Sequence, residues 1–456
     1  LCALAGVGVR STFGGHAAVD EPQYLLTAVS LWEDHDLDIS DELAVERWRE
    51  FSDVDLPVQT RVLDDGRQLS PHDPLLPLLV AAPVGIFGWM AAKVVLALVA
   101  AAAAALTCWV AVRRFAVPVG LAALGTGVLF ATPPLAVYGQ QVYPEMPAAL
   151  AVLAAVAALT GPGRRRNDVL LVAAVVALPW LGVKYAPVAA VLAVLGLVRA
   201  HRSGRVGAAT FTVGALAAAG SGYLLLHRLI WGGWTVYGTG DHFRTAGEFS
   251  VVGVTPDYAD RTVRLVALLV DREFGLVPWQ PALLLLVPAA AALLRRREWP
   301  LLAPLAAGWA TATWLALTMH GYWWPGRQVV VVLPIAVVVL LTWVAHVRPA
   351  ALRRAVAAVA GVLASAGVAT YIALLVDGYH RRLTWVYDFP AVDAPAYEAV
   401  GPLLPDYRGS EFLVPHLFWV TALAGLAYLG WSGATRVIRH RPARAVPFPK
   451  EKENRP

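Results

Sequence analysis

The sequence predicts an all-α polytopic membrane protein with about twelve transmembrane helices and a large first extracytoplasmic loop that carries juxtamembrane helices. The 456 residues are 58% hydrophobic and only 15% charged, whereas a soluble domain has about 25% charged residues. Eleven apolar runs follow one another along the chain, and clusters of arginine recur between them. Long apolar segments with basic residues in alternate connections are typical of a chain that crosses a bilayer repeatedly.

The eleven apolar runs are the predicted helices. About 20 apolar residues cross the hydrocarbon core as a helix, and five runs come close to that length: residues 94–112, 206–226, 300–318, 329–345 and 355–376. Six shorter runs complete the set: residues 117–132, 146–160, 168–181, 186–198, 281–294 and 412–431. Residues 1–9 are interpreted as the tail of a further helix, and a cleaved signal peptide is the alternative.

The arginines predict the orientation. Positive residues favour the cytoplasmic side of a membrane, and all the clusters face that side together only if residues 75–89 do not cross. This segment, which contains Pro and Gly, is therefore predicted to be a short helix at the outer surface. Both termini are then cytoplasmic, in a multi-pass protein of the inner (plasma) membrane. The clusters lie at residues 113–114, 164–166, 199–205, 295–297, 348–354 and 436–444.

The first outer segment is unusually acidic. Residues 10–74 contain fifteen Asp and Glu against five Arg, a net charge of −10 in a chain whose total is +5. A long acidic segment between helices is typical of a folded functional element, and residues 230–279 are predicted to form a second such element. The segments predicted outside are residues 10–93, 133–145, 182–185, 230–279, 319–328 and 377–411.

Asp20 and Glu21 stand near the start of the acidic segment, just after a short apolar run. Ionisable groups at a membrane boundary are costly to place there and are functional candidates by default. One carboxylate would take a proton from an acceptor hydroxyl within hydrogen-bond reach, while the other would bind or orient. A solvated pair of loop acids is the alternative.

Two further outer segments carry candidate site residues. His72 lies in a Ser-Pro-His-Asp-Pro run that ends the acidic segment, where it either points into the site or caps a turn. Tyr143 approaches, and Glu145 begins, the helix expected at residues 146–160. The helix dipole favours a carboxylate at that position, which would suffice for a purely structural role. The polar and aromatic approach to Glu145 favours a site wall.

Three cations lie on the predicted outer side, against the positive-inside trend. The chain has only four lysines, and Lys93 and Lys184 stand at outer helix ends, while Arg327 follows a Trp-Trp-Pro-Gly turn. The compact charge of lysine and the fork of arginine both suit phosphate oxygens. Snorkelling to lipid headgroups is the alternative for the two lysines.

Acids and cations thus converge from several outer loops, which is typical of an active site at the membrane surface. A channel would line the middle of its helices with polar groups, and an ion-coupled transporter would hold ionisable residues near the membrane midplane. The predicted helices contain few charges at mid-depth, so both classes are disfavoured.

The order of these motifs resembles the C-type (GT-C) membrane glycosyltransferases of the protein-O-mannosyltransferase and aminoarabinose-transferase kind. Residues 20–25, which include Tyr24, and residues 36–38 resemble the first outer loop of that family, whose acidic residue is the catalytic base. Residues 70–75 resemble the end of that loop. Residues 143–145 are similar to the family's second acidic position.

The later part of the chain adds to the resemblance. Lys184, followed by Tyr185, stands where relatives place a lysine on the lipid phosphate. Asp271 and Glu273 belong to a segment similar to a loop motif of bacterial members, and residues 325–327 resemble a late arginine motif. The resemblance covers residues 1–345, which are expected to form a catalytic transmembrane module. The composition predicts C-terminal transmembrane helices over 346–435 and a basic, disordered cytoplasmic tail over 436–456.

The resemblance implies an inverting glycosyltransferase that moves a sugar from a polyprenyl-phosphate donor to an extracytoplasmic acceptor, which is a glycan, a lipid or a protein. Asp20, Glu21 and Glu145 would be catalytic. The donor phosphate would be bound by Lys184, Arg327 and Lys93. Tyr24, His72, Tyr143, Tyr185, Asp271 and Glu273 would line the site.

Two alternatives stay open. The first is a flippase or transporter of lipid-linked sugars, which would need a polar path through the membrane. The second concerns cofactors: none is predicted, but a divalent cation held by Glu21 together with His72 is left as an alternative. The expected partners are the lipid-linked donor, the acceptor and membrane lipid, with no nucleic acid.

Overall fold

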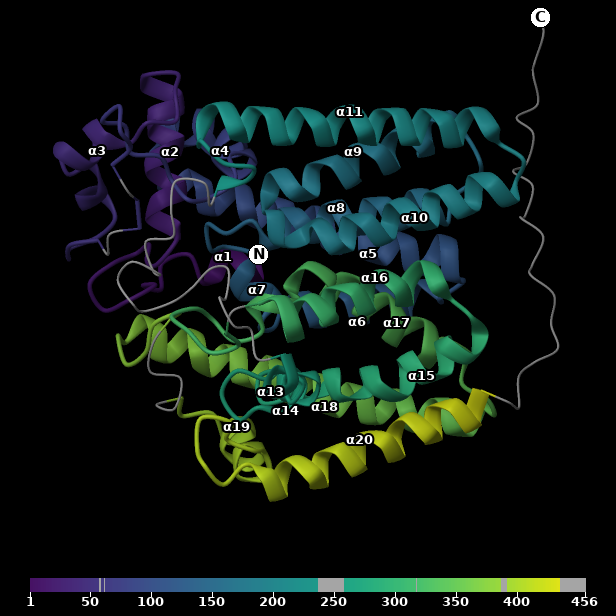
Figure 1. Cartoon of the computed structure of the whole chain (residues 1–456). Coiled ribbons are helices and arrows are strands. Elements are labelled where there is room, and N and C mark those ends of the chain that lie inside the picture. Colours follow the sequence, from purple (N-terminus) through teal and green to yellow (C-terminus); the bar gives the residue numbers. More distant parts are fainter. Residues whose placement is uncertain (57–58, 61, 237–257, 317, 387–391, 435–456) are drawn as a thin grey trace, which may run out of the picture.

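Helices form the regular elements of the described chain. The computed structural model describes residues 1–56, 59–60, 62–236, 258–316, 318–386 and 392–434. Within these ranges, β contacts occur only as isolated bridges, such as the one between Asp38 and Leu69. Figure 1 shows the long helices lying side by side in one bundle. The predicted all-α class is confirmed.

Each of the eleven predicted apolar runs contains a helix. Helices are expected there, because a segment removed from water must satisfy its backbone N–H and C=O groups internally. They are α5 (Met90–Phe115), α6 (Val119–Phe130), α8 (Glu145–Leu159), α9 (Arg165–Leu181), α10 (Ala186–Arg202), α11 (Val206–Ile230), η4 (Pro281–Leu285) with α15 (Leu286–Arg296), α16 (Trp299–Ala310), η6 (Arg327–Val332) with α17 (Leu333–His346), α18 (Ala350–Tyr379) and α20 (Leu413–Ala434).

Six helical segments in the described ranges are long and apolar enough to cross a membrane, and the chain is a multi-pass membrane protein. The apolar helices Leu75–Phe87, Val119–Phe130, Glu145–Leu159 and Pro281–Arg295 are shorter, so the predicted number of about twelve crossings is not established. The six segments are Met90–Phe115, Val183–Arg202, Val206–Ile230, Arg327–His346, Ala350–Tyr379 and Leu413–Gly433.

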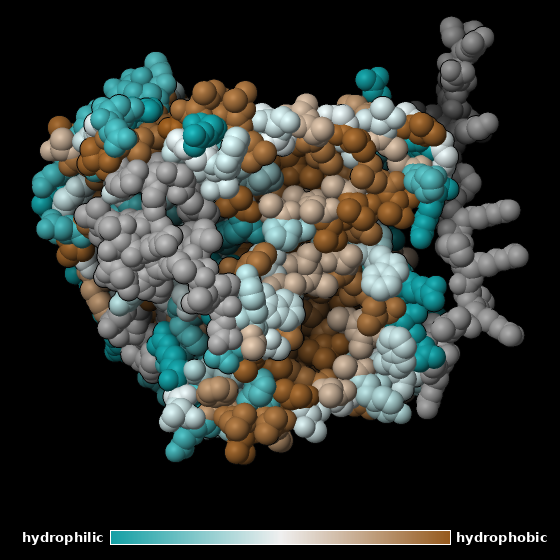
Figure 2. Space-filling view, in the orientation of Figure 1, coloured by the Kyte–Doolittle hydropathy of each residue, from teal (hydrophilic) through white to brown (hydrophobic). Residues whose placement is uncertain are grey.

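The helices differ in how far the protein itself covers them. The segment Arg327–His346 is mostly buried, and its helix α17 packs against α5, α15 and α16. Helices α11 and α20 instead expose apolar side chains, among them Leu225, Leu229, Phe418 and Leu429. Figure 2 shows hydrophobic residues over broad areas of the visible face. Such a surface fits contact with lipid rather than water.

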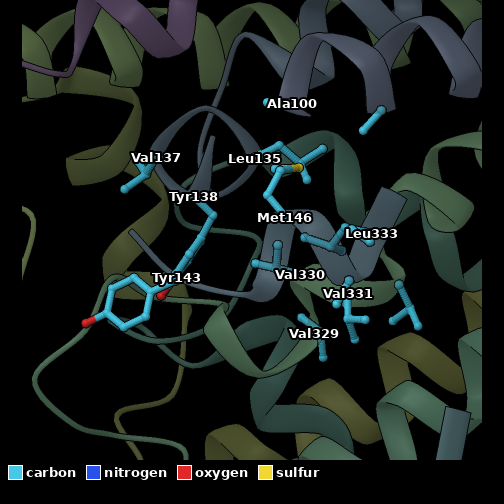
Figure 3. Packing of buried hydrophobic residues seen from close by; sticks show 14 of the residues in the cluster. Ala100, Leu135, Val137, Tyr138, Tyr143, Met146, Val329, Val330, Val331 and Leu333 are labelled. Carbon is cyan, nitrogen blue, oxygen red and sulfur yellow. The ribbon is translucent and has the colours of Figure 1, made fainter. Parts of the chain in front are cut away.

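An apolar core lies where η6 passes α8 and α7 (Leu135–Tyr138). Figure 3 shows Leu135, Met146 and Val330 among the side chains gathered there, and all three are buried. Close packing of such side chains stabilises the contact between helices through van der Waals attraction. This packing holds the first residues of α8 and η6, both of which are charged, in fixed relation to each other.

The short helices of the first loop gather at one end of the bundle. They are α2 (Glu21–Glu33), α3 (Ser40–Ala44), η1 (Arg47–Glu50) and α4 (Leu75–Phe87). Figure 1 shows α2, α3 and α4 together at that end, with α19 (Pro395–Val400) at the same end of the long helices. Helix α4 is the short helix predicted over residues 75–89 and packs against α2 and α5. Its place at the membrane surface remains a prediction.

The remaining predictions have mixed outcomes. Residues 1–9 do not form one helix, because α1 covers only Cys2–Ala5 and a turn follows. The segment predicted over 230–279 contains α13 (Tyr258–Arg261) and α14 (Arg264–Val270), while its residues 237–257 lie outside the described ranges. The predicted tail, residues 436–456, also lies outside them. The short turn between α9 and α10 is η2 (Val183–Tyr185), and η8 (Gly401–Leu403) follows α19.

A glycine brings α20 against α15, and this contact is testable. A Cβ at position 430 would lie 2.1 Å from the backbone oxygen of Pro288, and overpacking of a tight contact costs about 1–3 kcal/mol. We expect Gly430→Val to lower the melting temperature of the protein in detergent. Gly425→Val is the matched control in the same helix, because nothing lies within 4 Å of a Cβ there. Equal melting of the two variants would contradict the close approach.

Candidate active site

Four charged side chains from four separate segments meet near the first residues of α2 and α8. Asp20 immediately precedes α2, Glu145 is the first residue of α8, Lys184 lies in η2, and Arg327 is the first residue of η6. Gly326 allows the chain to turn into η6, because its φ of 82° is a conformation that glycine adopts without strain.

Arg327 joins the two carboxylates. Its Nη2 donates a hydrogen bond to Oδ2 of Asp20 at 2.6 Å, and its Nε donates to Oε1 of Glu145 at 2.8 Å. Lys184 Nζ donates to the same Glu145 oxygen at 2.8 Å. Arg327 and Glu145 are buried, and the side chain of Asp20 is 15% exposed. The cluster therefore contains two anions and two cations whose charges balance.

The position of Asp20 sets its protonation. Burial alone raises the pKa of a carboxyl, because the ionised form loses its hydration. Attraction to Arg327 and His72, together with the hydrogen bond from Arg327, outweighs burial and lowers the pKa of Asp20 to about 2. Asp20 is therefore ionised at neutral pH. It is a weak base while Arg327 holds it, and a ligand that draws Arg327 away makes it a stronger one.

Aromatic rings surround the cations. The guanidinium carbon of Arg327 lies 4.2 Å from the ring centre of Tyr143 and 5.4 Å from that of Trp323. Lys184 Nζ lies 5.2 Å from the ring centre of Tyr185. A desolvated cation over a ring gains up to about 2 kcal/mol. Tyr143 and Tyr185, both predicted as wall residues, are thus beside the charged cluster.

His72 and Tyr24 form another wall of the cluster. Their rings stack with centres 4.6 Å apart, and His72 Nε2 lies 4.0 Å from Oδ1 of Asp20. Burial lowers the pKa of His72, although Asp20 acts in the opposite direction, so the ring is neutral at pH 7. Gln59 was not predicted: its Oε1 lies 3.3 Å from His72 Nε2, and its Nε2 donates to the backbone oxygen of Val19 at 2.9 Å. No motif marks Gln59.

Two polar atoms beside the cations find no hydrogen-bond partner among the described residues. They are Oε2 of Glu145 and the hydroxyl of Tyr185, and both are buried. An unmet buried polar group costs about 1–3 kcal/mol, and such groups are normally satisfied by protein or by ordered water. The cluster therefore has the capacity to bind a polar ligand.

Glu21, which was predicted to be catalytic, does not face this cluster. It is fully buried, and its Oε2 accepts hydrogen bonds from Ser11 Oγ at 2.7 Å and from the backbone N of Ala18 at 3.1 Å. Its Oε1 accepts from the backbone N of Val142 at 2.8 Å. Both carboxylate oxygens are therefore occupied, and their hydrogen bonds fasten the start of α2 to the segment that leads into α8. Its role is to position Asp20.

The alternative of a cation held by Glu21 and His72 does not fit the structure. The two side chains face different partners, since His72 lies beside Asp20 and Gln59 while Glu21 binds Ser11 and two backbone amides. In the described chain, the group of acidic or histidine side chains close enough to share one ion consists of Asp34, Asp41 and Glu42.

Lys93, predicted to bind the donor phosphate, is also placed elsewhere. It is fully buried in α5, and its Nζ donates to the backbone oxygen of His16 at 2.7 Å. Nζ lies 5.8 Å from the ring centre of Trp89. A buried ammonium needs such partners because burial penalises its charge. Lys93 therefore holds the first loop against α5, and the structure does not bring it to Arg327 and Lys184.

Asp271 and Glu273 shape a turn after α14 rather than a wall of the cluster. Oδ1 of Asp271 accepts from the backbone N atoms of Glu273 at 2.9 Å and Phe274 at 2.6 Å, and its Oδ2 lies 3.2 Å from His320 Nε2. Glu273 pairs with Arg408 at 2.8 Å. Oδ1 of Asp271 thus satisfies the backbone donors of its own turn. The side-chain contacts of both carboxylates lead to His320 and Arg408 rather than to the two cations of the cluster.

Asp73 is a buried residue whose role the sequence did not reveal. Its Oδ2 accepts from the backbone N of Val183 at 2.9 Å, next to Lys184. Its Oδ1 accepts from the Tyr223 hydroxyl at 2.8 Å and lies 3.2 Å from His227 Nε2. Tyr223 and His227 lie four residues apart on apolar α11, a spacing that places them on one face. This polar pair on an otherwise apolar helix was the feature of the sequence that could have indicated a buried polar partner.

Comparisons with known proteins gave limited matches. No protein-family model and no curated protein matches the chain. The chain is similar to the crystal structure of ArnT from Cupriavidus metallidurans in the apo state, with a TM-score of 0.45 and 16% sequence identity, covering 94% of this chain and 75% of that one. The structure of the same protein bound to undecaprenyl phosphate matches with a TM-score of 0.42 and 15% identity, covering 94% and 76%.

Asp73 should be essential for the stability of the turn that carries Lys184. Asp73→Ala leaves a backbone amide and two buried side-chain groups without their acceptor, so we expect a loss of about 2–4 kcal/mol. The measurement is thermal melting of the purified protein. Asp55→Ala is the matched control, because its side chain is 88% exposed and its removal should leave melting unchanged. If the melting temperature of Asp73→Ala equals that of the wild type, the turn does not depend on this carboxylate.

Proposed function

We propose that this protein is an inverting membrane glycosyltransferase that moves a sugar from a polyprenyl-phosphate donor to an acceptor hydroxyl outside the cytoplasm. The observation that carries the proposal is the buried Arg327, which joins Asp20 to Glu145 with Lys184 bonded alongside. A carboxylate for proton transfer and two cations for a phosphate are thus within one cluster, and the motif resemblance agrees with this chemistry.

The cations would bind the donor phosphate. Arg327 and Lys184 hold carboxylates in the structure, so an arriving phosphate exchanges with Asp20 and Glu145 as their partner. The phosphate leaves as an anion when the bond between the anomeric carbon and its oxygen breaks. Cations already placed beside that oxygen stabilise the developing charge without further reorganisation. The aromatic rings beside Arg327 and Lys184 keep both cations in position.

Asp20 would act as the base. It takes the proton of the acceptor hydroxyl, whose oxygen forms a bond to the anomeric carbon as the bond to the phosphate oxygen breaks. Direct displacement inverts that carbon. Release from Arg327 raises the basicity of Asp20, so binding of the donor phosphate prepares the base for the acceptor. His72, neutral at pH 7, lies 4.0 Å from the other oxygen of Asp20, and Glu145 holds the two cations in place until the phosphate arrives.

The location of the reaction is part of the proposal. The arginine clusters lie at the ends of the helices that are farthest from Asp20 and Arg327, and they favour a cytoplasmic position for those ends. The candidate active site would then lie at the outer face of the inner (plasma) membrane. A flippase of lipid-linked sugars has no specific observation in its favour in the described ranges. Asp20, Glu145, Lys184 and Arg327 stand at helix starts or in a turn rather than along a path through the helices.

The proposal is tested by replacing the base. We expect Asp20→Asn to lower turnover of a polyprenyl-phosphate sugar by roughly 10²- to 10⁴-fold, because an amide cannot accept the proton. Donor binding should persist, since Arg327 and Lys184 remain. The measurement is single-turnover transfer by purified protein to acceptor hydroxyls, with Asp64→Asn as a control that removes an exposed carboxylate of the same loop. Near wild-type turnover of Asp20→Asn would exclude Asp20 as the base.

The side of the membrane on which the first loop lies is tested separately. We expect a cysteine placed at exposed Asp64, in a chain whose Cys2 and Cys108 are replaced by serine, to react with an impermeant thiol reagent in intact cells. A flipped lipid-linked donor is available on the outer side, where the loop would then meet it. Labelling only after the membrane is broken would place the first loop in the cytoplasm and contradict the proposed location.

A further inference from the structure

A second group of carboxylates lies at the other end of α2 from Asp20. Residues 34–42 contain five acidic side chains: Asp34, Asp36, Asp38, Asp41 and Glu42. Asp34 follows the last residue of α2, and Asp41 and Glu42 lie in the first turn of α3. None of these residues belongs to the proposed transferase site.

Three of the five carboxylates converge. Asp34, Asp41 and Glu42 each offer one oxygen such that the three oxygens lie within 4.8 Å of one another. Asp34 and Asp41 are exposed, but Glu42 is only 3% exposed, and no side-chain donor of the described residues bonds to its two buried oxygens, which lie beside the carboxyl group of Asp41. A buried carboxylate without a donor is strongly disfavoured unless another group neutralises it.

The other two carboxylates are used by the loop itself. Oδ1 of Asp36 accepts from Ser30 Oγ at 2.9 Å and from the backbone N of Asp38 at 2.9 Å. Oδ1 of Asp38 accepts from the backbone N atoms of Ser40 at 3.1 Å and Gln68 at 2.8 Å. These bonds order the turn between α2 and α3.

No cation of the described chain compensates Glu42. The charged groups that act on it are those of Asp41 and Asp34, which have the same sign. Arg47, a basic residue of the adjacent η1, instead pairs with Glu33 at 2.9 Å and Glu50 at 3.1 Å. The cluster thus combines up to three negative charges with one side open to solvent.

We propose that Asp34, Asp41 and Glu42 bind a calcium ion. Carboxylate oxygens are the ligands that hard divalent cations prefer. Calcium takes about six to eight oxygen ligands at 2.3–2.6 Å in flexible geometry, whereas magnesium demands a near-ideal octahedron at 2.0–2.1 Å. Three side chains from a helix end and a short helix suit the ion that tolerates irregular geometry, and water completes its coordination from the exposed side.

The ion joins the end of α2 to α3. It supplies a positive charge beside the buried carboxylate of Glu42. It also links two elements of the first loop whose carboxylates otherwise repel each other. Its role is to stabilise the fold of this loop, so the proposal does not depend on the transferase chemistry and is tested without it.

The test is calcium-dependent thermal melting of the purified full-length protein in a nonionic detergent after treatment with a chelator. We expect the melting temperature to rise with calcium and to saturate at a dissociation constant of about 10⁻³ M or below. Asp41→Asn and Glu42→Gln should each weaken that constant by at least about tenfold. Asp41 is exposed, so its variant is expected to fold normally, and Glu42→Gln should melt no lower than wild type when calcium is absent.

Asp64→Asn is the matched control, because it removes one exposed carboxylate from the same loop and should leave the calcium response unchanged. A calcium response of wild-type size in Asp41→Asn and Glu42→Gln would overturn the proposal, since binding would then occur elsewhere. The absence of any response in the wild type up to about 10 mM calcium would overturn it as well. An equal response to magnesium would overturn the assignment of the ion.

Discussion

The candidate site depends on the buried guanidinium of Arg327. A charge removed from water is strongly destabilising unless it is paired and hydrogen-bonded, and breaking a buried pair costs about 3–5 kcal/mol. Arg327 meets this requirement by bonding Asp20 and Glu145 at once, while Tyr143 lies on its face. The starts of α2, α8 and η6 are therefore held together by one side chain. Lys184 joins the turn between α9 and α10 to the same group.

A surrounding set of hydrogen bonds keeps those starts in place. Glu21 fastens the start of α2 to the segment before α8, and Asp73 fastens the end of the first loop to η2 and α11. Each is the chain neighbour of a residue in the candidate site, Asp20 and His72 respectively. Adjacent side chains on a turn point in different directions, so one faces the cluster while the other is bonded to the protein. The site is thus held in place because Glu21 and Asp73, the chain neighbours of its residues, are hydrogen-bonded to other parts of the protein.

The first loop is anchored by buried apolar side chains, such as Leu25, Ile39 and Trp48, and by polar groups as well. Lys93 holds it to α5, and the Arg327 cluster holds the start of α2. The proposed calcium ion would do the same at the end of α2. The polar anchoring also offsets the mutual repulsion of the carboxylates in this loop.

The sequence by itself determined the helices. Apolar runs become helices wherever water is excluded, so each of the eleven runs contains one, and the short helix α4 was predicted as well. The sequence also indicated Asp20, Glu145, Lys184 and Arg327, because charges at the ends of apolar helices are costly and therefore conspicuous. What it could not determine is which of several similar charges face one another.

Only the tertiary structure decided those pairings. Asp20 and Arg327 lie 307 positions apart, and nothing local distinguishes Asp20 from Glu21, or Lys184 from Lys93. The direction of a side chain is set by the packing of its element against others, which a single sequence does not display. Glu21, Lys93, Asp271 and Glu273 accordingly have structural contacts in place of the predicted site roles. Gln59 and Asp73 acquire theirs only because the fold brings distant segments to them.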